Sequence, residues 1–192
     1  MAEQRDQREP GIDRVQLLLD KQDIYDAVVR YCRGFDRFDE KLALASFHDD
    51  AVVNYNGYEV PAAEWLPSSI AFARSGGVRE CTHHICNHIV DVDGDVALSE
   101  ASYLAFTPVE IEGRALDLWV AGRLVDRFER RDGVWRIAHR TTVYDWKRMY
   151  DPATVAGGSA YLAGLDAGVQ GAPFPDDITY LLAVTRRDGA NG

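Results

Sequence analysis

The sequence predicts one α+β domain in which helices come first and an antiparallel sheet follows. Apolar residues recur at helical spacing over residues 15–35. Residues 78–147 instead form long β-type stretches that are joined by tight turns. The length of 192 residues allows one sizeable hydrophobic core. Each element can be justified in chain order.

The first helix is expected over residues 15–35. Its apolar residues recur at spacings of three, four and seven and form one stripe, which consists of Leu17, Ile24, Val28, Tyr31 and Phe35. We expect a break near residues 20–22, after which Asp23 caps an inner helix start. Asp39 has an N-cap side chain and predicts a short second helix over residues 40–47.

Turn signals divide the rest of the domain. Residues 51–55 and 58–60 flank Asn56-Gly57, which is a strong signal for a two-residue hairpin turn. Residues 61–75 predict a further helix, which ends at Gly76-Gly77. Four long strands are then expected, with turns at Asp93-Gly94 and Asp132-Gly133; they span residues 78–92, 96–107, 116–130 and 134–146.

Alternation assigns the two faces of the last strand. A regular strand points Trp135, Ile137, His139 and Thr141 to one face, and Val134, Arg136, Ala138, Arg140 and Thr142 to the other. A bulge would exchange the two faces beyond it. The side to which Arg140 points therefore depends on the regularity of this strand.

The domain boundaries follow from charge and periodicity. Residues 1–14 are charged and aperiodic, and we expect a flexible N-terminal tail. Residues 15–150 form the domain. Residues 151–192 lose periodicity, and we expect a C-terminal extension that serves either as a pocket lid or as a segment crossing to a neighbouring subunit.

Composition excludes several classes of protein. The formal charge of −10 disfavours binding to nucleic acid, which needs a basic face, and docking on an anionic membrane. No apolar run reaches the roughly 20 residues of a membrane helix. The charged N-terminus has no apolar signal core, and the three cysteines form no CxxC pair, so we expect a cytoplasmic location. No GxSxG, GxGxxG or phosphate-loop motif is present.

Three of the five histidines lie within residues 83–88. His83 can serve as a general base if a carboxylate such as Asp36 fixes its tautomer. The alternative for His83 is a hydrogen-bonded core histidine, and the alternative for Asp36 is a solvated carboxylate at the end of a helix. A regular strand puts His84 and His88 on the face opposite His83, as polar surface or interface residues. A zinc site at these two is disfavoured, because they would lie roughly 13 Å apart along a strand. We therefore expect no metal.

Two further polar residues are weaker candidates. Tyr31 lies on the apolar stripe, where a tyrosine is usually a core residue with its hydroxyl at the edge. Arg140 needs an acidic partner or a ligand if it points inward. Arg123 and Asp126 are equally compatible with a structural cross-strand pair.

Three segments together resemble the SnoaL-like branch of the nuclear transport factor 2-like superfamily. They are the helix ending RYCRGFDRFDEKLALASFHDDA, the strand THHICNHIVDVDGD and the hairpin RLVDRFERRDGVWRIAHR, and the resemblance covers roughly residues 15–150. It implies a cone-shaped domain, in which a strongly curved, mixed sheet wraps around the N-terminal helices and leaves an apolar pocket. Within the branch, the chain is most similar to the scytalone dehydratase, hexachlorocyclohexane dehydrochlorinase and bile acid 7α-dehydratase group.

The resemblance also implies roles for four residues. The group uses a histidine–aspartate dyad; Asp36 matches its aspartate, and Asn87 aligns its histidine with His83. Tyr31 matches a polar residue before that aspartate, and Arg140 a basic residue on the last strand. With this alignment, a catalytic role for His83 outweighs a core role.

The expected function is that of a cofactor-independent lyase, a dehydratase that acts on an apolar cyclic or aromatic small molecule. His83 would take a proton, Asp36 would orient it, Tyr31 would polarise a carbonyl or assist the leaving hydroxyl, and Arg140 would stabilise negative charge. The alternatives are an isomerase or polyketide-cyclase-type enzyme and a non-catalytic binding module. A homo-oligomer is expected, with a trimer favoured over a dimer.

Overall fold

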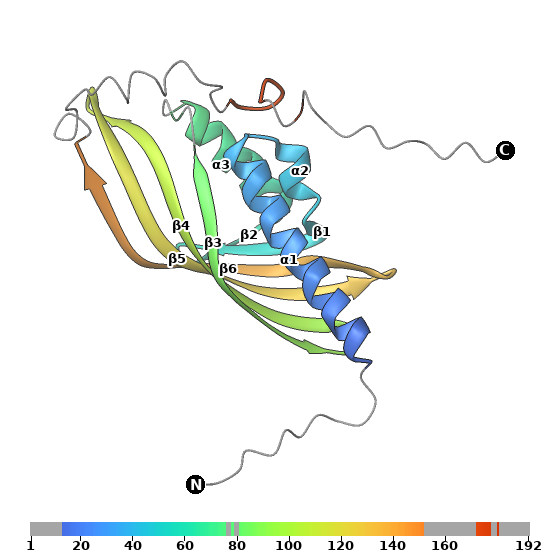
Figure 1. Ribbon diagram of the computed structural model, residues 1–192. Coiled ribbons are helices and arrows are strands. Elements are labelled where there is room, and N and C mark those ends of the chain that lie inside the picture. Colours follow the sequence, from blue (N-terminus) through green and yellow to red (C-terminus); the bar gives the residue numbers. More distant parts are fainter. Residues whose placement is uncertain (1–12, 76–77, 79–80, 152–171, 178–179, 181–192) are drawn as a thin grey trace, which may run out of the picture.

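A computed structural model describes residues 13–75, 78, 81–151, 172–177 and 180. A curved sheet wraps around the helices in this part of the chain (Figure 1). The helices are α1 (Arg14–Asp36), α2 (Glu40–Leu44) and α3 (Ala62–Ser75). The strands are β1 (Phe47–Tyr55), β2 (Tyr58–Pro61), β3 (Thr82–Asp93), β4 (Val96–Ile111), β5 (Arg114–Arg131) and β6 (Val134–Tyr150).

The sheet is mixed, with the strand order β2-β1-β6-β5-β4-β3. Neighbouring strands are antiparallel except for β1 and β6, which pair in parallel. The helix α1 contacts β3 and β6, and α3 contacts β1 and β2. The core lies between these helices and the concave face of the sheet (Figure 1). The predicted fold class, an α+β domain with helices inside a curved sheet, is confirmed.

Local signals in the sequence predicted most of the helix positions correctly. The Asp39 carboxylate accepts a hydrogen bond from the backbone N–H of Leu42 at 3.0 Å and caps α2 as predicted, although α2 ends at Leu44. Gly34 has a further role, because a Cβ there would lie 2.5 Å from the backbone nitrogen of Ala43. Its missing side chain lets α2 pack against the end of α1.

The predicted break near residues 20–22 is wrong, because α1 runs without interruption from Arg14 to Asp36. Its N-cap is Asp13, which accepts from the N–H of Val15 at 2.9 Å, and not Asp23. The polar residue Asp20 at the predicted break is explained by contacts between α1 and the sheet. Asp20 is only 5% exposed and faces the sheet.

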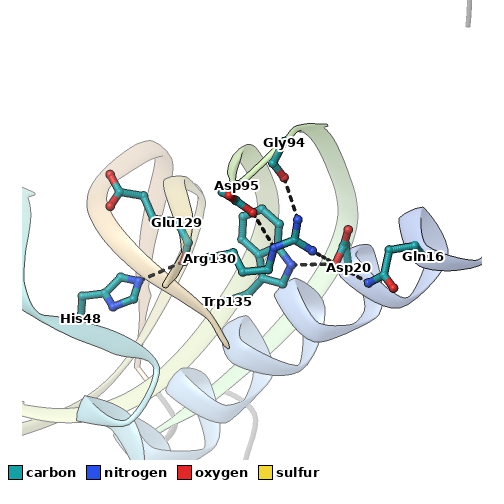
Figure 2. Close-up of polar contacts among 8 residues, drawn as sticks. All are labelled: Gln16, Asp20, His48, Gly94, Asp95, Glu129, Arg130 and Trp135. Carbon is teal, nitrogen blue, oxygen red and sulfur yellow. Dashed lines mark hydrogen bonds and ion pairs between the residues drawn. The ribbon is translucent and has the colours of Figure 1, made fainter. Parts of the chain in front are cut away.

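Figure 2 shows how Asp20 attaches α1 to the sheet. One oxygen, Oδ1, accepts from Gln16 Nε2 at 3.0 Å, from Arg130 Nη1 at 2.9 Å and from Trp135 Nε1 at 2.9 Å. Arg130 also donates to Asp95 at 2.8 Å, so the cluster joins the helix to two hairpins. These donors satisfy the buried carboxylate and offset the cost of removing it from water.

The predicted hairpins are present, and β4, β5 and β6 extend beyond their predicted ends, whereas β3 begins at Thr82 and not at the predicted residue 78. In β6, however, Ile137 pairs with Phe128 and His139 with Arg127, so Ala138 has no partner in β5. This bulge exchanges the faces beyond it. Arg140 therefore lies on the inner face with Trp135 and Ile137, whereas His139 points outward toward Glu59; the assignment for a regular strand is wrong from this point on.

Both predicted terminal segments lie largely outside the described residues. Of the tail over residues 1–14, only Asp13 and Arg14 are described, and they begin α1. Of the extension over residues 151–192, residues 151, 172–177 and 180 are described. The backbone N–H of Phe174 donates to the carbonyl of Arg37 at 2.6 Å, and Asp177 pairs with the Arg37 side chain at 3.1 Å. Within the described ranges, no helix is long and apolar enough to span a membrane.

Candidate active site

Asp36 and His83 form a direct pair between α1 and β3. Asp36 is the last residue of α1, and His83 is the second residue of the edge strand β3. The Asp36 Oδ1 atom lies 2.6 Å from His83 Nδ1, and Oδ2 accepts from the His83 backbone N–H at 2.9 Å. Because a carboxylate accepts hydrogen bonds, this contact assigns the proton to Nδ1. The other ring nitrogen, Nε2, is then the basic atom.

The pair also changes the proton affinity of the imidazole. Burial lowers the pKa of His83, but the hydrogen bond to Asp36 and the nearby Cys81 raise it, and the net pKa is well above 6.5. Asp36 is 8% exposed and the His83 side chain 14% exposed, so solvent screens this interaction only weakly. The arrangement stabilises an imidazolium and makes the neutral ring a stronger base.

Cys81 is a third member of this cluster that the sequence interpretation missed. Its Sγ lies 3.7 Å from His83 Nδ1 and 3.3 Å from the hydroxyl oxygen of Thr107. The signal was available, because Cys81 precedes His83 by two residues and strand alternation puts such residues on one face. The thiol is 5% exposed.

Aromatic side chains surround the imidazole. The rings of Phe35 and Tyr103 each lie 5.7 Å from the His83 ring, measured between centroids. Trp65 stacks on Phe35 at 6.5 Å and contacts Tyr55 at 5.5 Å. Nothing in the sequence pattern singled out Tyr103, because the sheet register alone brings it near the histidine.

Two of the sheet tyrosines remain neutral hydrogen-bond donors at physiological pH. Burial raises the pKa of Tyr103 to about 12. Burial and the neighbouring Tyr55 also raise the pKa of Tyr144, whose ring lies 6.2 Å from that of Tyr55. The Tyr103 hydroxyl occupies space that Gly122 leaves free, since a Cβ at that position would lie 2.9 Å from this oxygen.

Arg140 and Tyr31 lie together deeper in the core. Arg140 has no exposed surface and donates to both oxygens of Asp126, at 2.7 and 2.6 Å. Its guanidinium carbon lies 4.0 Å from the centroid of the Tyr31 ring, which is a cation–π contact. Burial raises the pKa of Tyr31, and the Arg140 charge lowers it only in part. One Arg140 nitrogen, Nη1, has no hydrogen-bond partner among the described residues.

Arg123 and Asp126 do not form the structural pair that the sequence allowed. Asp126 faces inward and pairs with Arg140, whereas Arg123 faces outward and pairs with Asp145 and Glu100. The predicted Arg123–Asp126 pair is therefore wrong, since the two residues lie on opposite faces of β5. Their separation of three positions on one strand already excludes a shared face in a regular strand.

The other two histidines of the cluster have different positions. His84 points outward as predicted, and its ring lies 5.4 Å from that of Phe106. His88 points inward, which contradicts the prediction, because β3 contains an extra residue between Ile85 and His88. His88 Nε2 lies 2.8 Å from the hydroxyl of the buried Ser99. The two histidines are thus on opposite faces and cannot share a metal ion.

A pocket of about 390 Å³ leads to the dyad between α1 and β3. Its volume is within the usual range for small-molecule sites. Asp36 and His83 line it together with apolar residues such as Val29, and Arg33 and Arg37 line it near the end of α1. The lining thus combines a histidine–carboxylate pair with apolar and basic side chains.

Helices packed inside a curved mixed sheet, with this dyad at the end of α1, define a domain of the nuclear transport factor 2-like class. The SnoaL-like domain model matches residues 16–141, and the chain belongs to this family.

Solved structures agree in fold. Hexachlorocyclohexane dehydrochlorinase LinA-type3 from Novosphingobium barchaimii is 19% identical with a TM-score of 0.65, and the match covers 76% of this chain and 97% of that chain. A protein from Novosphingobium aromaticivorans assigned by name as a scytalone dehydratase is 20% identical with a TM-score of 0.62, covering 71% and 91%. The Kfla4162 protein from Kribbella flavida is 17% identical with a TM-score of 0.61, covering 69% and 95%. No curated protein matches the chain.

Proposed function

We propose that the protein is a cofactor-independent lyase, a dehydratase that acts on an apolar cyclic or aromatic small molecule. The observation that carries the proposal is the contact of 2.6 Å between Asp36 and His83 at the end of a pocket. This distance is within the range that a base and its orienting group require. Membership of a family whose structural relatives include proteins named as a dehydrochlorinase and a dehydratase supports the same class.

In the proposed reaction, His83 Nε2 takes a proton from a carbon that is acidified by a neighbouring carbonyl. The electron pair of the C–H bond forms a C=C bond, and the C–O bond to the leaving hydroxyl breaks. The hydroxyl departs as water after receiving a proton. Asp36 holds the imidazole in the productive tautomer and stabilises the imidazolium that forms.

The remaining roles in the proposal come from the family resemblance. Tyr31 polarises the substrate carbonyl or protonates the leaving hydroxyl, as the family resemblance implies. Arg140 is completely buried against Tyr31, so in this proposal it stabilises negative charge through that ring and its hydroxyl. Tyr103, whose ring lies beside that of His83, provides a second neutral hydroxyl in this proposal.

The test compares a histidine of the dyad with a histidine outside the pocket. Cyclic β-hydroxy carbonyl compounds are incubated with the protein, and the loss of one water is followed by mass spectrometry. We expect His83→Ala to reduce turnover by about 10²–10⁴-fold. His139→Ala is the matched control, because His139 points outward toward Glu59 on β6 and the pocket is lined by other residues. Turnover of His83→Ala within a few-fold of wild type would refute the mechanism.

Two other functions use the same pocket. An isomerase or polyketide-cyclase-type enzyme could use the same dyad, and a product of unchanged mass marks an isomerase. A non-catalytic binding module would be favoured by a separation of Asp36 and His83 above about 4 Å. The observed 2.6 Å favours an enzyme.

The proposal includes a homo-oligomer, with a trimer favoured over a dimer, and a cytoplasmic location. Large aromatic residues on the outer face of the sheet support association. Trp119, Trp146 and Tyr150 are 41%, 42% and 49% exposed, and an aromatic surface of this kind is typical of interfaces. Trp146→Glu should lower the oligomeric state, which analytical ultracentrifugation measures. An unchanged sedimentation coefficient would exclude this face as the interface.

A further inference from the structure

Three side chains with different ligand atoms meet beside the pocket that two of them line. In the part of the chain that the structure describes, Asp36, Cys81 and His83 form the one group of acidic, cysteine or histidine residues whose ligand atoms all lie within 4.8 Å of one another. Asp36 and Cys81 are buried, and His83 is partly buried. The group therefore differs from an exposed acidic cluster, because it combines one oxygen, one sulfur and one nitrogen donor.

The spacing of these atoms can be compared with that of a zinc site. Tetrahedral zinc with bonds of about 2.0–2.3 Å separates nitrogen and sulfur ligands by about 3.6 Å, and nitrogen and oxygen ligands by about 3.4 Å. Cys81 Sγ lies 3.7 Å from His83 Nδ1, which fits without any movement. Asp36 Oδ1 lies 2.6 Å from the same nitrogen, so a small rotation of the carboxylate is required.

The chemistry of the donors selects among metals. A set with one thiolate, one imidazole and one carboxylate suits Zn²⁺ better than the oxygen-preferring Mg²⁺ or Ca²⁺. Asp36 and His83 also line the pocket, which gives an ion a route to the cluster. Three protein ligands leave the fourth tetrahedral position for a water molecule.

We propose that Asp36, Cys81 and His83 bind one Zn²⁺ ion and that this ion inactivates the dyad. A ring nitrogen that binds a metal carries no proton. With Zn²⁺ on Nδ1, the remaining proton of the imidazole is on Nε2, and the ring has no free lone pair to accept a proton. The binding site is independent of the proposed function, whereas the inactivation rests on it.

The first experiment measures metal binding directly. The full chain, without a histidine tag, is titrated with Co²⁺, whose thiolate complexes have a characteristic charge-transfer absorption. We expect one equivalent to bind with this absorption in wild type and in Cys86→Ser, which removes an exposed thiol. Cys81→Ser should lose the absorption and weaken binding by roughly 100-fold, the upper end of the loss seen when a supporting group of a metal site is removed. Zn²⁺ should displace the Co²⁺.

Two results would overturn the proposal: no thiolate absorption in wild type, or an absorption that persists in folded Cys81→Ser. If Cys81→Ser does not fold, as circular dichroism shows, crystals of the wild-type protein soaked with Zn²⁺ decide the question. An anomalous peak between Cys81 Sγ and His83 Nδ1 supports the site, and a peak only at His84 or His88 contradicts it. If the wild-type protein binds no zinc but His83→Ala loses turnover, the metal site is rejected and the proposed function stands.

Discussion

Replacing Asp126 by alanine would leave the guanidinium of Arg140 buried without its carboxylate. Neither side chain has any exposed surface, and two hydrogen bonds of 2.7 and 2.6 Å join them. Removing one partner of such a pair costs about 3–5 kcal/mol, because an uncompensated charge remains in the core. In a protein of this size, each kcal/mol shifts the melting temperature by about 2–4 °C, so we expect a decrease of roughly 6–20 °C.

The matched control is Asp145→Ala. Asp145 also accepts from an arginine, Arg123, at 3.2 Å, but both side chains are more than one third exposed. Solvent screens this pair, and its loss should reduce the free energy of unfolding by less than about 1 kcal/mol. Urea unfolding followed by circular dichroism measures both variants.

A second variant separates the charge from the packing. Asp126→Ala combined with Arg140→Met removes both charges and should recover much of the stability that Asp126→Ala loses. If Asp126→Ala alone stays within about 1 kcal/mol of wild type, the inward position of Arg140 would be refuted. The same result would remove the structural basis for placing its charge against Tyr31.

The remaining predictions concern proton affinity and helix packing. Only neutral His83 accepts a proton, so turnover should increase with pH through the pKa of His83, which lies well above 6.5. Asp36→Asn should move this increase to lower pH and reduce the maximal turnover. Profiles of rate against pH measure both effects. The stability of the fold should change with pH in the opposite direction. The raised pKa of His83 stabilises the fold fully below the unfolded-state pKa of about 6.5, and this contribution is lost as pH rises through the folded-state pKa. Urea titrations at several pH values measure this change in stability. Gly34→Ala would bring a Cβ to 2.5 Å from the Ala43 nitrogen, so the unfolding free energy should fall by about 1–3 kcal/mol; an unchanged value would show that α2 is not held this closely.

Local signals in the sequence were sufficient for much of the fold. The cap at Asp39 and the turn at Asn56-Gly57 depend on residues that are adjacent in the chain, and both were predicted correctly. The break predicted near Asp20 failed because its polar side chain is satisfied by the distant Arg130 and Trp135. A carboxylate with tertiary donors has the same local pattern as one that interrupts a helix.

The candidate site was predictable in part. Asp36 and His83 are far apart in the sequence, and the family resemblance, not their spacing, brought them together. Their contact confirms that pairing, whereas their catalytic roles stay predictions. Tyr103 was missed, because a single tyrosine in a strand has no distinctive pattern. His88 was assigned to the wrong face, because the extra residue before it changes no composition or periodicity that a sequence pattern detects.

The unpaired residue Ala138 has a consequence for comparing this chain with its relatives. At about 20% identity, the correspondence between two β6 strands depends on where an alignment places a single gap. A gap on the wrong side of Ala138 equates the outward His139 with an interior basic residue and removes Arg140 from the core. Transfer of residue roles, or grafting of this strand into another SnoaL-like protein, must therefore be guided by strand pairing at Ala138.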